Sequence, residues 1–257
     1  MKIPQNWWKD FFKSIYLITD ARSVCDPHLT RKEVNIIERA LDPDKSHKLL
    51  DLCGGQGRHA LELARRGYKD ITVLDFSDYL IRLGKRTTRK HGRSVKFVRR
   101  DARSTGLSTG GFEAVFIMAN SFGYFTREKE NVRVLKEAHR LLKKKGKLLL
   151  DLTDADQAKK NLQPVSWHEA TDDIMVLRQR KLNKDLITAR EVVISKKKGL
   201  LKDGSYCARL YSKGKIKKIL RTAGFEKISV QDNLCLHRQK KDYGFLTSRM
   251  IVTASKP

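Results

Sequence analysis

The stretch Leu49–Tyr68, LLDLCGGQGRHALELARRGY, determines how the rest of this 257-residue chain is interpreted. Residues 47–52 form an apolar run that predicts a buried strand, and a glycine-rich turn follows at once. Residues 58–67 then place apolar side chains at helical intervals and end on Gly67, a residue type that commonly follows a helix. A strand, a glycine turn and a helix in this order are typical of a nucleotide-binding βα unit.

Alternation of strands and helices extends well beyond this unit. Helices are expected at 77–92, where Ser77 is a candidate N-cap, at 127–146 and at 212–224. Strands separated by helices predict right-handed crossovers, so the fold class is α/β with a parallel sheet that helices cover on both faces. The further strands are expected at 70–76, 95–102, 112–120, 147–152, 225–232 and 245–255.

The N-terminal region is expected to be helical. Residues 5–18 place aromatic and apolar side chains at spacings of three and four, which predicts one helix with an aromatic face. A second helix is expected over 30–41, where Thr30 and Glu33 have the spacing of a capping box. We therefore expect residues 1–46 to form a helical cap.

Residues 153–210 follow a different pattern from the chain on either side. Their β-rich segments are separated by the short sequences NKD and KDG, which predicts antiparallel strands joined by turns. We expect this segment to be an inserted subdomain that serves as a lid or as a dimer surface. The core then comprises residues 47–152 and 211–257.

The charge of the chain is strongly positive. Its 55 Lys and Arg residues outnumber 29 Asp and Glu residues, for a net charge of +26. The basic residues concentrate at 82–103 and 178–221. Such an excess attracts polyanions, so RNA is one partner hypothesis, beside a small-molecule acceptor and a second copy of the chain in a homodimer. Basic residues scattered over solvated faces are the simpler explanation.

Composition argues against membrane and metal-binding classes. Apolar runs stay short of the roughly 18 residues that a membrane-spanning helix needs, and the N-terminal residues lack a continuous signal core. The four cysteines lie far apart and without metal-binding spacing, so they are expected to be reduced thiols. A cytoplasmic protein with no metal site is expected.

The glycine turn itself has two interpretations. Residues 55–60, GQGRHA, match the G-x-G-x-x-G/A pattern of dinucleotide binding, and Asp75 follows Gly55 by twenty residues. By that pattern alone the chain is an NAD(P)-dependent oxidoreductase. Asp51 argues against this class, because a carboxylate beside the turn repels a pyrophosphate. It suits a ligand with an ammonium group next to the turn, such as S-adenosylmethionine.

The same stretch resembles the first motif of the class I S-adenosylmethionine-dependent methyltransferases, usually an acid followed by three alternating glycines. Here the pattern is Asp51, Cys53, Gly55 and Gly57, so Cys53 replaces the first glycine. The resemblance implies a Rossmann-like, doubly wound, seven-stranded and mostly parallel sheet, with an antiparallel β insert after the fifth strand. It also implies that Asp51 binds the methionine ammonium of the cofactor, while the backbone from Cys53 to Gly57 accommodates the methionine part.

Two later strand ends match further motifs of this family. Asp75 matches the acid of the second motif, and the resemblance implies that it binds the ribose hydroxyls, with Phe76 beside the adenine. Asp101 matches the acid of the third motif and, with Ala102, is implied to receive the adenine amino group. Because such sheets bind ligands at the carboxyl ends of their strands, the acids are expected to meet at one edge. Tyr16 of the N-terminal region is expected to close over the cofactor.

The sequence MANSFGYF, residues 118–125, resembles the fourth motif of small-molecule methyltransferases. In that group the residue at the position of Tyr124 faces the acceptor, so Tyr124 is the first candidate to orient or deprotonate it, and Asn120 is expected to line the methyl-transfer site. His168, in the insert, is a further candidate base. The resemblance implies methyl transfer to a nitrogen or oxygen of a small molecule. The alternative is an rRNA or tRNA methyltransferase that uses the basic surface.

Overall fold

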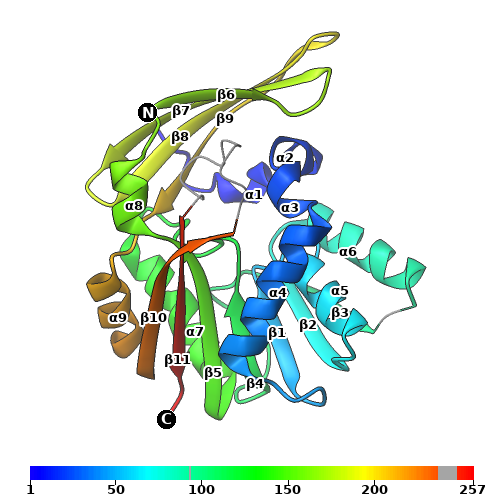
Figure 1. Ribbon diagram of the computed structural model, residues 1–257, viewed down its shortest axis with the longest axis vertical. Coiled ribbons are helices and arrows are strands. Elements are labelled where there is room, and N and C mark those ends of the chain that lie inside the picture. The colour runs from blue at the N-terminus through cyan, green and yellow to red at the C-terminus, as the bar shows by residue number, and fades with distance from the viewer. Residues whose placement is uncertain (93, 237–247) are drawn as a thin grey trace.

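A seven-stranded sheet forms the centre of the computed structural model, which describes residues 1–92, 94–236 and 248–257 (Figure 1). Its strands follow the order β10-β11-β5-β4-β1-β2-β3. They are β1 (Lys48–Leu52), β2 (Asp70–Asp75), β3 (Val95–Arg99), β4 (Phe112–Ile117), β5 (Leu142–Thr153), β10 (Glu226–Cys235) and β11 (Ser248–Ser255). β1 pairs in parallel with β2 and β4, whereas β11 runs antiparallel to both β5 and β10. The predicted seven-stranded, mostly parallel sheet is thereby confirmed.

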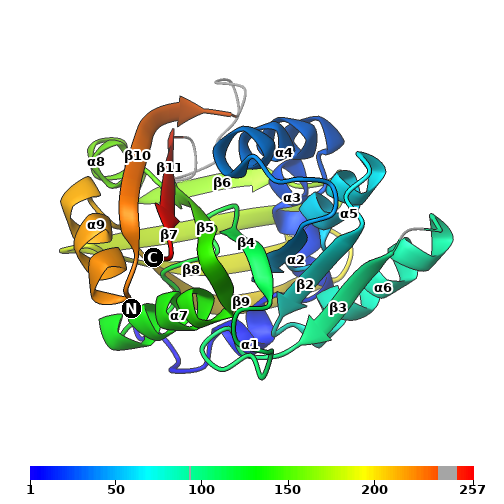
Figure 2. The same ribbon diagram turned by 90° about the horizontal axis from the view of Figure 1, so that it is seen from below.

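Helices cover both faces of this sheet (Figure 2). One face carries α4 (Pro27–Leu41), α5 (Arg58–Arg65) and α6 (Asp78–Lys90), and the other carries α7 (Glu128–Leu141) and α9 (Lys213–Thr222). Successive residues of a strand point to opposite faces, so Leu49 packs with the first group of helices and Leu50 with the second. The core strands are therefore buried on both faces, which explains why their sequences are apolar without a polar side.

A second, four-stranded antiparallel sheet lies across the carboxyl ends of the core strands (Figure 1). Its order is β6-β7-β8-β9, and it follows a short helix, α8 (Ala155–Lys160), which the sequence did not predict. Its strands are β6 (Val165–Glu169), β7 (Ile174–Asn183), β8 (Leu186–Ser195) and β9 (Gly199–Arg209). The antiparallel insert of the predicted fold class is confirmed, whereas the exact domain boundaries stay a prediction.

One of the two predicted turns of this insert is wrong. The sequence NKD does join β7 to β8, but KDG, residues 202–204, lies inside β9. The turn before β9 is formed instead by three lysines, Lys196 to Lys198, and Gly199 enters the strand at a positive φ of 76°. Gly204 of KDG pairs in regular register with Glu191, so this glycine does not end the strand, and the register shift after Val193 lies nearer the turn.

The N-terminal segment forms three short helices, so the prediction of one helix over 5–18 is wrong. These are α1 (Trp8–Phe11), α2 (Ser14–Thr19) and α3 (Ala21–Val24). The break falls at Phe12, whose backbone leaves the helical region. Its carbonyl oxygen accepts a hydrogen bond of 2.6 Å from the Ser77 hydroxyl, so a contact with the core replaces continuation of the helix.

The predicted capping box at Thr30 and Glu33 is also wrong. Helix α4 starts three residues earlier, at Pro27, where the missing amide hydrogen of proline is no loss. Asp26 caps it by accepting hydrogen bonds from the amides of His28 and Leu29. Glu33 is fully buried inside the molecule instead, where it belongs to a cluster of charged groups.

Candidate active site

A cavity of about 1040 Å³, its open mouth included, lies at the carboxyl ends of the core strands. This is where the strand order reverses, because β1 has β2 on one side and β4 on the other, and sheets of this kind bind ligands at such a point. We call this space the first cavity. Most of the residues predicted to bind the cofactor line it: Tyr16, Asp51, Cys53, Gly55, Asp75, Phe76, Asp101 and Ala102. Tyr124 lines it too.

The glycine turn wraps closely around the end of β1. Cys53, Gly55 and Gly57 all have positive φ, at 63°, 58° and 74°, which explains why a glycine is usual at the position of Cys53. A side-chain carbon added to Gly57 would lie 2.9 Å from the Phe97 ring. Gly57 is not among the residues that line the first cavity. Its small size serves packing between the turn and the sheet.

Asp51 is a fully buried carboxyl group, and neither of its oxygen atoms accepts a hydrogen bond from a residue that the structure describes. Burial raises its pKa to about 8, and the positive charge of Arg58 only partly opposes this effect. A side chain at position 54 would not fit, because a carbon added to Gly54 would clash with the Asp51 carboxyl group. An ammonium group placed in the first cavity would supply the missing partner, so the residues present fit the methionine end of S-adenosylmethionine.

Asp75 ends the neighbouring strand and is held by the turn itself. Its two oxygen atoms accept hydrogen bonds from the amides of Gly55, at 2.9 Å, and Ser77, at 2.8 Å. Burial nevertheless raises its pKa above the usual value. Each carboxylate oxygen can accept more than one hydrogen bond, so the side chain is held in place and still able to bind a pair of hydroxyls.

Asp101 lies in the first cavity but is already paired. Arg103 donates to it through Nη2 at 2.6 Å and through Nε, and the pair holds the pKa of Asp101 below its usual value despite partial burial. The Arg103 guanidinium also lies over the rings of Trp8 and Phe125, at 5.3 and 4.4 Å from their centroids. Asp101 therefore reaches the cavity as part of an ion pair stacked on aromatic rings.

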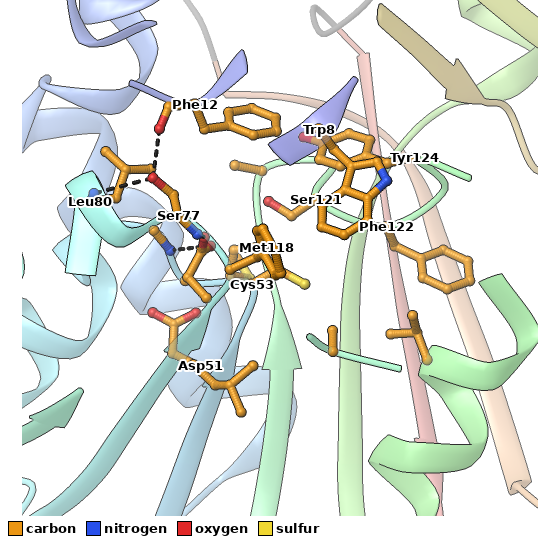
Figure 3. Close-up of a pocket in the computed structure, with 18 of the residues that line it drawn as sticks. Trp8, Phe12, Asp51, Cys53, Ser77, Leu80, Met118, Ser121, Phe122 and Tyr124 are labelled. Carbon is orange, nitrogen blue, oxygen red and sulfur yellow. Dashed lines mark hydrogen bonds between the residues drawn. The ribbon is translucent and has the colours of Figure 1, made fainter. Parts of the chain in front are cut away.

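Aromatic side chains cover the side of the first cavity opposite Asp51 (Figure 3). Trp8 meets the Phe76 ring edge-on at 4.6 Å, and Phe12 stacks on Tyr124 at 5.5 Å. The Ser77 hydroxyl connects the N-terminal segment to the core, because it donates a hydrogen bond to the Phe12 carbonyl and accepts one from the Leu80 amide (Figure 3). Trp8 and Phe12 were not among the predicted site residues, and their only sequence signal is the aromatic spacing of the N-terminal segment.

A second cavity lies between the N-terminal helices and the antiparallel sheet. It meets the first cavity at shared lining residues that include Tyr16, Ala119 and Tyr124. Asn120, predicted to line the methyl-transfer site, lines the second cavity, and its Oδ1 accepts a hydrogen bond from the Thr153 amide at 2.9 Å. His168 lines neither cavity, and its Nε2 lies 3.3 Å from the Thr19 carbonyl oxygen.

The two tyrosines at the junction differ from free tyrosine in acidity. Burial is the largest cause that raises the pKa of Tyr124 well above its usual value, and burial does the same for Tyr16 with the charge of Asp20 adding to it. Both side chains are therefore neutral phenols near pH 7. They can donate hydrogen bonds, but neither is suited to removing a proton.

A buried charge cluster supports the loop between the two cavities. Arg249 donates to Asp151 at 2.8 Å, and the other oxygen of Asp151 accepts from the Ala119 amide at 2.9 Å. Ala119 and Asn120 both have positive φ, 54° and 56°, a strained state for residues other than glycine. Glu33 joins the cluster, 3.6 Å from the Arg249 Nη1. Sequence reasoning missed the roles of Asp151 and Arg249 in this support, because the partners are far apart along the chain.

Two classes of feature are absent from the described part of the chain. No group of three or more His, Cys, Asp or Glu side chains in residues 1–92, 94–236 and 248–257 could hold a metal ion. In the same residues, none of the helices combines the length and the apolar composition that crossing a bilayer requires.

The fold and this site define a class I methyltransferase: a doubly wound sheet, a glycine turn and acids at the ends of β1 and β2. A family model described as a methyltransferase domain matches residues 49–146. Residues 49–146 of the chain therefore match a methyltransferase domain. The interpretation of the turn as a dinucleotide site is set aside.

The sequence relatives are distant. YqeM of Bacillus subtilis (strain 168), which is named as a methyltransferase, is 26% identical over 143 residues, or 56% of this chain and 56% of that protein. The glycine/sarcosine N-methyltransferase of Parasynechococcus marenigrum (strain WH8102) is 28% identical over 120 residues, or 46% of this chain and 42% of that protein. The chain thus spans about half the length of the curated relatives it matches.

Solved structures match over nearly the whole chain. An S-adenosylmethionine-dependent methyltransferase from Clostridium acetobutylicum ATCC 824 has a TM-score of 0.74 at 15% identity and covers 94% of this chain and 96% of its own. CalS10, an amino pentose methyltransferase from Micromonospora echinaspora with bound S-adenosylmethionine, has a TM-score of 0.68 at 14% identity and covers 96% and 99%. At such identities the likeness concerns the fold alone.

Proposed function

We propose that this chain transfers the methyl group of S-adenosylmethionine to a nitrogen or oxygen atom of a small-molecule acceptor. The observation that carries the proposal is the buried carboxyl group of Asp51 beside the glycine turn, which has no hydrogen-bond partner among the described residues. The first cavity would hold the cofactor and the second cavity the acceptor. The two spaces meet beside Tyr16 and Tyr124, where transfer would take place.

Three acids would hold the cofactor in the first cavity. Asp51 would bind the methionine ammonium, and the turn from Cys53 to Gly57 would follow the methionine chain. Asp75 would bind the ribose hydroxyls, since its backbone contacts keep it in place. Asp101 and Ala102 would lie at the adenine end, with Phe76 against the ring.

Alignment and exclusion of water are the main contributions that the protein would make. When bound, S-adenosylmethionine supplies a methyl carbon on a sulfonium, whose carbon–sulfur bond breaks toward sulfur as the acceptor heteroatom takes the methyl group. Trp8, Phe12 and Tyr124 would keep water from the junction. Tyr124 would orient the acceptor as a hydrogen-bond donor, because its raised pKa disfavours the phenolate. The methylated product would lose its extra proton to bulk water once it has left the junction.

The names of similar proteins support a small acceptor. One relative is named a glycine/sarcosine N-methyltransferase, and one structural neighbour is an amino pentose methyltransferase. Both names describe acceptors that carry an amine. An amine is therefore the first acceptor chemistry to test.

The basic segment 178–221 has uses inside the molecule that weigh against RNA binding there. Arg178 and Arg180 are buried on the inner side of the antiparallel sheet. Further basic residues of this segment are paired with acids: Arg190, Lys196, Lys202, Arg209, Lys213 and Lys215. Fewer positive charges of this segment are then available to bind RNA phosphates than the number of its basic residues suggests.

Two measurements test the proposal. Calorimetric titration with S-adenosylhomocysteine and with NAD separates the cofactor classes, and binding of NAD alone would overturn the assignment. Transfer of a radiolabelled methyl group to amines, hydroxy compounds and RNA then separates the acceptor classes. We expect label in a small amine or hydroxy compound; label in RNA alone, with binding that weakens steeply as salt is added, would refute the small-molecule proposal.

A further inference from the structure

Arg180 is a buried cation that has no acidic partner among residues 1–92, 94–236 and 248–257. It lies on β7, lines the second cavity and is only 4% exposed. Its Nη1 donates to the Gln163 carbonyl oxygen at 3.2 Å and to the Ser166 hydroxyl at 2.9 Å, both of which are neutral. Its Nε has no partner. Burying a guanidinium without an anion is costly, so this position calls for an explanation.

The remaining arginines of the second cavity differ from Arg180 in this respect. Each pairs with at least one acid: Arg58 with Glu33, Arg178 with Asp20 and Glu191, and Arg249 with Asp151. One positive charge is therefore left uncompensated among the described residues that line this cavity. A single charge matches a monoanion such as a carboxylate. A phosphate dianion would lie near Asp20 and Glu191 and fits less well.

The strand register provides a place for such a group. Arg180 on β7, Ala189 on β8 and Tyr206 on β9 lie opposite one another in one row across the sheet. Neighbouring positions in such a row are about 5 Å apart. Arg180 and Tyr206 both line the second cavity, whereas Ala189 between them is fully buried and does not line it. A planar carboxylate inside the second cavity can lie within reach of the guanidinium.

We propose that the methyl acceptor carries a carboxylate and that Arg180 binds it. This inference rests on the proposed function, since it identifies the class of molecule that the second cavity takes. The acceptor is then a small amino or hydroxy acid, whose amine or hydroxyl lies beside Tyr124 while its carboxylate lies against Arg180. The anchoring would fix the distance between the reacting heteroatom and the junction of the two cavities.

Matched acids and amides test this directly. The probes are glycine, sarcosine, 4-aminobutyrate, anthranilate and glycolate, each beside its primary amide, with phosphoethanolamine as the phosphate counterpart. Radiolabelled methyl transfer is measured for each, and the same probes are titrated into the complex with S-adenosylhomocysteine. We expect at least one acid to exceed its amide by about tenfold or more in kcat/KM or in affinity. Equal values for every pair, no binding of any acid, or a preference for phosphoethanolamine would overturn the inference.

Variants separate anchoring from a structural role. Arg180→Met should remove the preference for acids over amides, while Arg180→Lys should retain part of it. Arg190→Met is the matched control, because Arg190 lies on the same sheet, is largely exposed and pairs with Asp203. If Arg180 only supports β6 through Gln163 and Ser166, then Arg180→Met should lower the rates with acids and amides equally, and this result would also overturn the inference.

The test distinguishes two kinds of failure. Absence of S-adenosylhomocysteine binding would refute the proposed function itself. Normal binding of S-adenosylhomocysteine with no discrimination between acids and amides would refute only the role of Arg180. Arg180→Met should also leave the melting temperature of the ligand-free protein unchanged or higher, since it removes an uncompensated buried charge.

Discussion

The two cavities are built mainly from different parts of the chain. Each contains one charged group without a partner of opposite charge among the described residues, an acid in the first cavity and a cation in the second. The first cavity is formed by the ends of core strands, and its Asp51 is an acid without a partner. The second cavity is formed between the N-terminal helices and the antiparallel sheet, and its Arg180 is a cation without an acidic partner in the part of the chain that the structure describes. A site that binds a cationic cofactor and an anionic acceptor has this arrangement. The comparison teaches that the ligand's charge can be inferred from the charge that each cavity leaves uncompensated.

Removal of Asp75 should have the largest effect on the first cavity. Asp75→Ala should lower the affinity for S-adenosylhomocysteine by about a hundredfold, because two charge-assisted hydrogen bonds worth about 1.5 kcal/mol each are lost. Calorimetric titration measures the effect. Asp70→Ala, at the other end of β2, is the control and should leave the affinity unchanged, since Asp70 pairs with Lys96 away from the cavity. Unchanged affinity in Asp75→Ala would refute its assigned role.

Neutralising Asp51 should change both affinity and pH dependence. Asp51→Asn should lower the affinity for S-adenosylhomocysteine at pH 8 by about tenfold. The wild-type affinity should rise with pH up to about 8, because an ammonium ligand requires the ionised carboxylate, whose pKa in the free protein is about 8. The variant should not show this rise. A wild-type affinity that is flat between pH 6 and 8 would contradict the proposed pairing.

Stability should respond to the same group with the opposite sign. The folded-state pKa of Asp51 is about 8 and lies above the unfolded value of about 3.9, so the folded protein holds the extra proton between these limits. Its contribution to stability is complete below the unfolded pKa and is lost as the pH rises toward 8. Asp51→Asn should therefore stabilise the ligand-free protein at pH 8, by on the order of 1 kcal/mol or more, measured by urea unfolding. At pH 4 the two proteins should be similar.

A smaller effect is expected at the junction of the cavities. Tyr124→Phe should lower turnover about fivefold, because one neutral hydrogen bond to the acceptor is lost, while the affinity for S-adenosylhomocysteine changes by less than about twofold. Steady-state kinetics and calorimetry on the same variant measure the two quantities. Equal losses in both would assign Tyr124 to the first cavity alone.

The smallest effect is expected where the N-terminal segment is tied to the core. Ser77→Ala removes the cap of α6 and the hydrogen bond to the Phe12 carbonyl, and should lower the free energy of unfolding by about 1 kcal/mol. Thr87→Ala is the control within the same helix, since the Thr87 hydroxyl donates to the Leu83 carbonyl of that helix. If the hydrogen bond from Ser77 to Phe12 also shapes the cavities, Ser77→Ala should bind S-adenosylhomocysteine slightly less tightly. A free energy of unfolding equal to that of Thr87→Ala would refute the role of Ser77 in holding the N-terminal segment.

Most of the core could be predicted because its signals are local. An apolar strand, a turn with positive φ and an amphipathic helix each depend on neighbouring residues, and the prediction of Ser77 as an N-cap is confirmed for this reason. The placement of Asp51 and Asp75 at one sheet edge follows from the topology that these elements imply. Gly57 was predicted to accommodate the cofactor, and this stays a prediction; its small size also meets a packing need against Phe97.

The errors occur where a distant contact competes with a local preference. The helix expected over 5–18 breaks at Phe12 because the Ser77 hydroxyl takes its carbonyl oxygen. Glu33 does not cap a helix because Arg58 and His59 pair with it in the interior. A capping hydrogen bond is worth about 1 kcal/mol, so a buried charge cluster easily outweighs it.

The sequence by itself determined the doubly wound core, the glycine turn and the acids that follow its strands, since hydrophobic period and backbone freedom are properties of short segments. Only the tertiary structure decided that Arg180 would be buried with no acid paired to it among the described residues, that Trp8 and Phe12 would cover the first cavity, and that Arg249 would support the loop at Ala119. These features depend on which distant charges and rings come into contact. Such pairings are energetically decisive, yet they leave no periodic pattern in the chain.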